Sequence, residues 1–224
     1  MTVLPELIGR AAVFDLDRTL LAGSSLVALA RAMSRSGLLS GQQLVTGLAM
    51  DQVFRRRGAS DEDVDRLRSA ALRHVAGVDV ARLRSLAGDV GRTLSEQVLP
   101  GARMLLRRHQ DAGDFVVILS ASPQELVEAI AERLGAQRAV GTRAEIAGAR
   151  FTGALDGPFC YGAGKVQRLE QDLGPGSLDG ATAYADSISD LPVLEACLEP
   201  VAVNPDRALH RVAKARGWPV VRFA

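Results

Sequence analysis

Two aspartates, Asp15 and Asp17, follow a short apolar run from Ala11 to Phe14 near the start of the chain. The run is too short for an independent helix and rich in strand-forming residues, so it predicts a buried β-strand. The aspartates then lie at the carboxyl end of that strand, the edge where open α/β sheets bind ligands. Two carboxylates this close repel each other unless a cation or a shared proton relieves them. The pair therefore predicts a metal or acid–base site, the alternative being two solvated loop residues.

Further polar side chains come at equivalent places along the chain, where a predicted strand ends or the next helix begins. This set consists of Ser120, Lys165, Asp186 and Asp190. Because the carboxyl ends of parallel strands converge, we expect these residues to meet Asp15 and Asp17. Mg²⁺ prefers oxygen ligands and needs one or two direct carboxylates. Asp15 and Asp186 are the predicted direct ligands, with Asp190 behind them.

Ser120 and Lys165 suit a phosphate group. Ser122, Pro123 and Glu125 have capping-box spacing with proline in the first turn, which predicts a helix N-terminus that favours an anion beside Ser120. Only two of the 27 basic residues are lysines, so a retained lysine indicates a need for a compact ammonium group. The ordinary alternatives are a plain strand-to-helix turn, a surface lysine and, for the segment ADSISD, a simple helix cap.

The predicted elements fall into two groups. Helical patterns fill residues 22–37, 40–58, 60–77 and 79–99, and Ser40 with Gln43 has capping-box spacing. From residue 101, helices alternate with strands at 115–120, 137–155 (a strand and a hairpin), 181–187, 201–204 and 220–223, and Asn204 with Pro205 is the predicted start of the last helix. This alternation predicts a Rossmann-like parallel sheet with helices on both faces. The core comprises residues 1–21 and 100–224, and residues 22–99 form an all-helical cap domain inserted after the first strand.

Composition excludes several classes of protein. The 224 residues have a net charge of +1, 47% hydrophobic and 24% charged residues, which favours a globular protein that binds no nucleic acid. No signal-peptide pattern and no run of about 18 apolar residues occurs, so we expect a cytoplasmic protein without a membrane span. Cys160 and Cys197 are interpreted as core residues. The run Arg55 to Arg57 is interpreted as a solvated helix end rather than a contact to an acidic substrate, and the oligomeric state is not indicated.

Four segments in order, FDLDRTL, ILSAS, GAGK and ADSISD, resemble the motifs of the haloacid dehalogenase (HAD) superfamily. The helical insert is similar to the cap of its phosphoserine-phosphatase-like branch, subfamily IB. The resemblance implies a Mg²⁺-dependent phosphatase that hydrolyses a small-molecule phosphomonoester through an aspartyl phosphate. It also implies roles for individual residues: Asp15 as nucleophile, Asp17 as general acid and base, Ser120, Ala121 and Lys165 as phosphate ligands, Asp15, Asp186 and the backbone carbonyl of Asp17 as metal ligands, and Asp190 and Thr19 as supporting residues.

The sequence departs from the family pattern at Ser189, where many relatives carry asparagine. Asp17 favours phosphate esters, since the C–halogen hydrolases of this superfamily lack the second aspartate. Three alternatives remain at this point: a phosphotransferase or phosphomutase on the same scaffold, a signalling module that stores phosphate on aspartate, and a binding protein without activity.

The lack of an acidic residue soon after the first motif limits the possible substrates. Phosphoserine phosphatases of this branch carry a glutamate shortly after the first motif, placed to meet the substrate ammonium. Here Ser24 or Ser25 stands in that region, and the next carboxylate is Asp51. The second motif also reads Ser-Ala-Ser where those enzymes tend to have glycines. Because a desolvated ammonium without a partner is costly, the sequence predicts that L-phosphoserine is a poor substrate and that a phosphomonoester with an apolar or neutral body is better.

Overall fold

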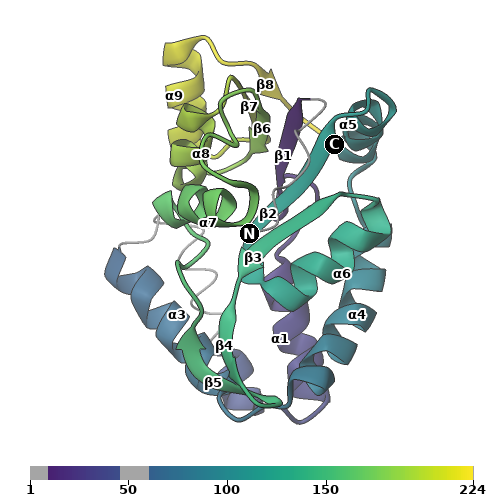
Figure 1. Cartoon of the computed structure of the whole chain (residues 1–224), viewed down its shortest axis with the longest axis vertical. Coiled ribbons are helices and arrows are strands. Elements are labelled where there is room, and N and C mark those ends of the chain that lie inside the picture. The colour runs from purple at the N-terminus through teal and green to yellow at the C-terminus, as the bar shows by residue number, and fades with distance from the viewer. Residues whose placement is uncertain (1–9, 46–60, 224) are drawn as a thin grey trace.

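A six-stranded parallel sheet forms the centre of the molecule in a computed structural model that describes residues 10–45 and 61–223. The strand order is β3-β2-β1-β6-β7-β8. The strands are β1 (Ala11–Asp15), β2 (Phe115–Pro123), β3 (Arg138–Thr142), β6 (Thr182–Ala185), β7 (Glu199–Val203) and β8 (Val220–Val221). The chain proceeds outward from β1 in one direction through β2 and β3, and in the other through β6 to β8 (Figure 1). The order therefore reverses beside β1, which is where such sheets bind ligands.

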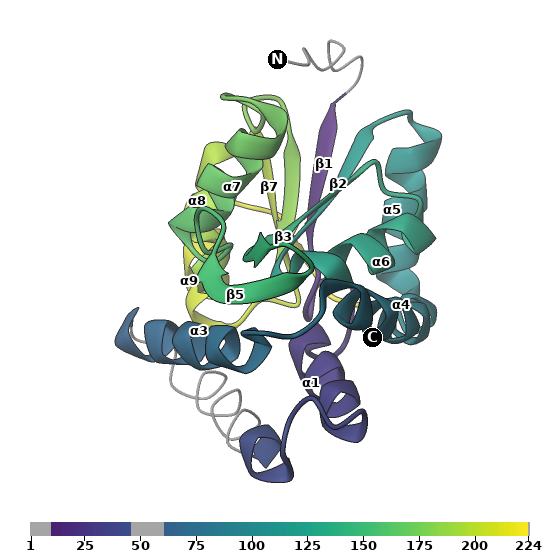
Figure 2. The ribbon, with the colours of Figure 1, turned by 60° about the horizontal axis from the view of Figure 1, so that its bottom comes forward.

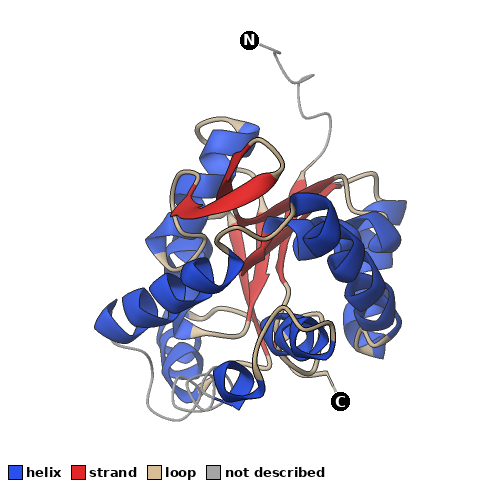
Figure 3. Ribbon diagram, turned by 90° about the horizontal axis from the view of Figure 1, so that it is seen from below, coloured by secondary structure: helices blue, strands red, loops and turns tan. Residues whose placement is uncertain are grey.

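Helices cover both faces of this sheet (Figures 2 and 3). The first face carries α5 (Pro100–Asp111) and α6 (Gln124–Leu134), and the second carries α7 (Ala163–Leu173), α8 (Leu191–Ala196) and α9 (Arg207–Arg216), with a 3₁₀ turn η1 (Ile188–Asp190) before α8. Side chains of β1 alternate between the two cores: Phe14 packs toward the α5 and α6 side, and Val13 toward α7 to α9. The predicted Rossmann-like α/β fold is confirmed.

The insert between β1 and α5 contains α1 (Ser25–Arg35), α3 (Asp61–Val75) and α4 (Val80–Glu96). It meets a hairpin of β4 (Ala144–Ala147) and β5 (Arg150–Leu155), as Figure 1 shows at the bottom of the molecule. Helix α4 lies directly on the core helix α6, because a Cβ on Gly91 would come within 2.8 Å of the Ala129 Cβ. The proposed division into a core and a cap at residues 22–99 stays a prediction, and α4 is the part of the insert that contacts the core most intimately.

The start of α6 differs from the prediction. Strand β2 continues to Pro123, and α6 begins at Gln124 without a side-chain cap. The predicted capping box of Ser122 and Glu125 is therefore wrong. The physical reason is tertiary, since the hydroxyl of Ser122 instead contacts the Ser25 hydroxyl, with 2.7 Å between the two Oγ atoms.

The start of α9 also differs. Asp206, rather than Asn204, caps the helix, and its carboxylate accepts hydrogen bonds from the amides of Ala208 and Leu209 at 2.9 and 2.8 Å. Asn204 has φ 43° and its side chain accepts a hydrogen bond from the Phe223 amide instead.

Other local predictions are confirmed. The capping box at Ser40 is formed, because its hydroxyl accepts a hydrogen bond from the Gln43 amide and the Gln43 side chain accepts one from the Ser40 amide. Cys160 is fully buried, Cys197 is partly buried, and both thiols are free. The arginine run at 55–57 and Asp51 lie outside the described residues. In the described part of the chain, no helix is long and apolar enough to cross a membrane.

Candidate active site

Three buried aspartates converge at the carboxyl edge of the sheet. Asp15 ends β1, Asp186 follows the neighbouring strand β6, and Asp190 ends η1. One carboxylate oxygen from each lies within 4.8 Å of the others. Side-by-side pairing of β1 and β6 brings the first two together, and the tight 3₁₀ turn returns the third to them. The predicted convergence of these three residues is thus present in the structure.

Two cationic side chains contact this cluster. The Lys165 ammonium lies 2.6 Å from an oxygen of Asp15 and 2.5 Å from one of Asp190. The Arg18 guanidinium lies 2.9 Å from Asp186. Lys165 reaches the cluster from the first turn of α7, where a Cβ on Gly164 would lie 2.0 Å from the carbonyl oxygen of Phe159. Glycine is therefore required for the turn that places the lysine.

Asp17 lies beside the cluster and is fixed by the insert. One of its carboxylate oxygens accepts a hydrogen bond from the Ser25 amide at 2.8 Å. The Ser25 hydroxyl contacts that of Ser122, and the Ser122 amide donates to the Ser120 hydroxyl at 3.1 Å. A continuous series of polar contacts therefore joins the first motif, the start of α1 and the second motif.

Burial changes the acidity of these carboxyl groups. It raises the pKa of Asp17 to about 6 and that of Asp190 to about 6. The pKa of Asp186 rises to about 8, chiefly because of burial and secondarily because of the nearby charge of Asp15. A carboxyl group with a pKa near 6 carries its proton in an appreciable fraction of molecules near neutral pH, which suits Asp17 to general acid catalysis.

The remaining predicted site residues surround this centre. Ser120 is buried within β2, one position beyond Leu119, which pairs with Asp15. The carbonyl of Ala121 accepts a hydrogen bond from the Thr142 hydroxyl at 2.8 Å. Thr19 is buried, and its hydroxyl has no hydrogen-bond partner among the described residues. The structure thus brings Asp15, Asp186, Asp190 and Lys165 together at one edge of the sheet, while the roles of all the predicted site residues stay predictions.

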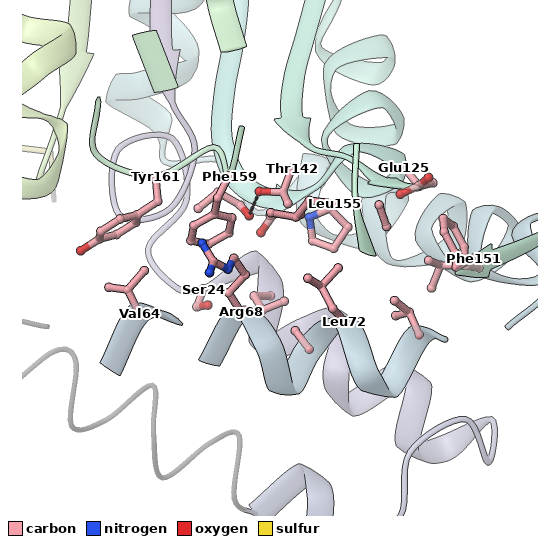
Figure 4. A pocket seen from close by; sticks show the side chains of 18 of the residues that line it. Ser24, Val64, Arg68, Leu72, Glu125, Thr142, Phe151, Leu155, Phe159 and Tyr161 are labelled. Atoms are coloured by element: carbon pink, nitrogen blue, oxygen red, sulfur yellow. Dashed lines mark hydrogen bonds between the residues drawn. The ribbon is translucent and has the colours of Figure 1, made fainter. Parts of the chain in front are cut away.

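A pocket of about 240 Å³ opens beside Asp17, between the insert and the core (Figure 4). Its walls are mainly apolar side chains from α1, α3, α4 and the β4–β5 hairpin, among them Leu26, Leu72, Leu83, Phe151 and Leu155. Besides Asp17, the charged residues in the lining are Arg68 of α3 and Glu125 of α6. The pocket places an apolar space next to the acidic cluster.

Three residues at this site escaped the sequence analysis. Arg18 was considered only as part of a motif, Ser25 only as standing, like Ser24, where phosphoserine phosphatases carry a glutamate, and Glu125 only as a capping residue. No local pattern indicates that Glu125 faces a pocket, because α3 and the hairpin that complete the pocket are distant in sequence. For Ser25, the signal was its position soon after the first motif, which brings it back to Asp17.

The carboxylate cluster and its paired lysine lie where the strand order of the parallel sheet reverses, beside a pocket under a helical insert. This arrangement is typical of α/β enzymes that transfer phosphoryl groups. The family model of haloacid dehalogenase-like hydrolases matches residues 12–195. The chain belongs to this family, in its phosphoserine-phosphatase-like branch, and is a phosphomonoesterase.

Similar proteins support this assignment. A probable phosphatase of Mycobacterium tuberculosis is 38% identical over 96% of this chain and 75% of its own length. A phosphoserine phosphatase of the same organism is 35% identical over 95% of this chain and 70% of its own, and a histidinol-phosphatase of Neisseria meningitidis is 30% identical over 95% and 98%.

Solved structures share the fold. A protein of unknown function from Bordetella pertussis has a TM-score of 0.81 and 28% identity, over 95% of this chain and 98% of its own. A substrate-bound phosphoserine phosphatase has a TM-score of 0.65 and 15% identity, over 95% and 92%.

Proposed function

We propose that the protein is a Mg²⁺-dependent phosphatase that hydrolyses a small-molecule phosphomonoester through an aspartyl phosphate on Asp15. The observation that carries this proposal is the position of the Asp15 carboxylate, which belongs to the acidic cluster and lies 2.6 Å from the Lys165 ammonium. A carboxylate oxygen placed beside a cation that can bind a phosphoryl oxygen is in position to attack phosphorus. The pocket beside Asp17 has room for the leaving alcohol.

The reaction divides into two displacements at phosphorus. An Asp15 oxygen forms a bond to phosphorus as the bond to the substrate's ester oxygen breaks, and Asp17 donates its proton to that oxygen. Asp17, now a carboxylate, then takes a proton from a water molecule that attacks the phosphorus, which releases inorganic phosphate and restores Asp15. Lys165 and Ser120 bind the oxygens of the transferring group in both steps.

The donor set of the site fits a divalent cation. Asp15, Asp17, Asp186 and Asp190 supply four carboxylates against the single charges of Lys165 and Arg18. Burial and the nearby charge of Asp15 raise the pKa of Asp186 to about 8. Asp15 and Asp186, with the backbone carbonyl of Asp17, are the proposed ligands, all of them the hard oxygen donors that Mg²⁺ prefers. Bound there, Mg²⁺ would neutralise negative charge on the phosphoryl group.

The test of this function is phosphate release from a panel of phosphomonoesters with Mg²⁺ and with excess chelator. We expect turnover that disappears with the chelator and returns with added Mg²⁺. As a readout independent of activity, Mg²⁺ should also raise the Tm, because a ligand that binds only the native state stabilises it. Turnover that persists in the chelator would contradict the proposal. Labelled phosphate that appears on an added alcohol rather than in solution would instead identify a phosphotransferase.

Within the same panel, L-phosphoserine should be a poor substrate, with kcat/KM at least about tenfold below the best compound, because its carboxylate meets acidic groups in the pocket. The panel should include L-histidinol phosphate, since relatives are named phosphoserine phosphatase and histidinol-phosphatase. Neither Ser24, which caps α1, nor Ser25, which contacts Asp17, supplies a carboxylate to the substrate's ammonium. The highest kcat/KM for L-phosphoserine would overturn this prediction.

A further inference from the structure

The carboxylate of Glu125 stands in the wall of the apolar pocket. Glu125 is the second residue of α6 and is partly buried, and Figure 4 shows it between Leu155 and Phe151, on the side of the pocket away from Tyr161. It forms no ion pair with any side chain that the structure describes. Burial raises the pKa of Glu125, an effect that its own backbone amide and the nearby Arg84 partly oppose. Arg84 is exposed on α4, and Glu125 itself lines the pocket.

The other charged groups near Glu125 are already engaged. Arg68, the cationic residue in the lining, lies 3.0 Å from Asp65 and stacks over the Phe159 ring at 5.9 Å from its centre. Glu128, one turn further along α6, accepts a hydrogen bond from the Gln124 side chain at 2.8 Å. Glu125 is thus a partly buried anion in an apolar wall without a paired cation, an arrangement that a bound cation would relieve.

We propose that Glu125 receives a positively charged group of the substrate, so that the preferred substrates are phosphomonoesters of amino alcohols. This inference rests on the proposed phosphatase function, because it assigns the other end of the same substrate. The phosphate lies at Asp15 and Lys165, the apolar walls contact the carbon chain, and the ammonium faces Glu125. A carboxylate on the substrate would lie in a pocket that Asp17 and Glu125 already make acidic, and is disfavoured.

This proposal changes one earlier expectation. An apolar or neutral body was predicted because no acid follows the first motif at Ser24 or Ser25. The structure supplies a carboxylate from α6 instead, in the lining of the same pocket as Asp17. In this proposal Glu125 selects substrates with a positive charge, although the chain lacks the glutamate that phosphoserine phosphatases carry after the first motif.

The experiment compares substrates that differ only in charge. It uses ω-aminoalkyl phosphates with two to five carbons, each paired with the n-alkyl phosphate in which a methyl group replaces the ammonium. For the wild type, kcat/KM of the best amine should exceed that of its alkyl partner by about tenfold or more, as expected of a partly buried charge pair. Glu125→Gln should reduce this ratio to within about threefold, chiefly through a lower kcat/KM for the amine.

Two controls separate the possible failures. Glu128→Gln removes a carboxylate of the same helix outside the pocket and should keep the wild-type ratio. p-Nitrophenyl phosphate reports the phosphatase reaction without any cationic group. If neither it nor the alkyl phosphates are hydrolysed, the proposed function itself fails. If they are hydrolysed but the wild type shows no preference for the amines, or Glu125→Gln keeps the preference, the assignment of Glu125 is overturned while the phosphatase function stands.

Discussion

Asp15→Asn should lower phosphate release by about 10⁴-fold or more on every substrate, the scale seen when a catalytic nucleophile is removed. The amide is nearly the same size as the carboxylate, but it is too weak a nucleophile to form the acyl phosphate. The substitution also removes one of the two carboxylates that contact the Lys165 ammonium. Steady-state release of inorganic phosphate with Mg²⁺ measures the effect.

The loss must be distinguished from unfolding. Asp89→Asn is a suitable control, because Asp89 is exposed on α4 and pairs only with the neighbouring Arg92 among the described residues. Such surface pairs contribute little to stability, so this variant should match wild type in both activity and Tm. If Asp15→Asn keeps its native Tm and still retains substantial turnover, Asp15 is not the nucleophile.

Asp17→Asn should separate the two halves of the reaction. An activated ester such as p-nitrophenyl phosphate needs no proton on its leaving group, so the variant should still release about one equivalent of p-nitrophenol per enzyme in a rapid burst. Later turnover should then be slow, because no base activates the water. With an n-alkyl phosphate the first step should itself fall by about 10²- to 10⁴-fold, the usual contribution of a general acid.

Stopped-flow absorbance and quenched assays of phosphate release would follow these two steps. Asp15→Asn provides the matched comparison, since it should show no burst with either substrate. Equal losses on the activated and the alkyl ester, without a burst, would mean that Asp17 has another role. The raised pKa of Asp17, about 6 through burial, is consistent with a group that must both give and take a proton.

The fold was predictable because its signals are local. Apolar runs such as 115–120 are strands, and the helical spacing of residues 163–173 is amphipathic, so the alternation of elements defined the parallel sheet before its geometry was known. Helix starts were less predictable where a tertiary contact competes. Ser122 has the spacing of a cap, but its hydroxyl is taken by Ser25, 97 positions away in the sequence. At α9, two acceptable caps lie close together and Asp206 forms the hydrogen bonds.

The acidic cluster was predictable for a different reason. Parallel strands bring their carboxyl ends to one edge, so Asp15, Lys165 and Asp186 could be placed together from strand ends alone. The pocket follows no such rule. Its walls come from an insert and a hairpin whose contact is long-range, so the place of Glu125 and Arg68 in the lining became known only from the folded chain.

The attachment of the insert has a consequence for motion. Ser25 holds the start of α1 to Asp17 and to the core strand β2, and Gly91 allows α4 to rest on α6. A third attachment joins α4 to the β4–β5 hairpin, where the Val80 amide donates a hydrogen bond to the carbonyl of Ala149 at the turn. Rotation of the whole insert as one body would break all these contacts together, so we expect substrates to exchange through smaller, local openings. Amide hydrogens of Ser25 and Val80 should then exchange slowly while the enzyme continues to turn over.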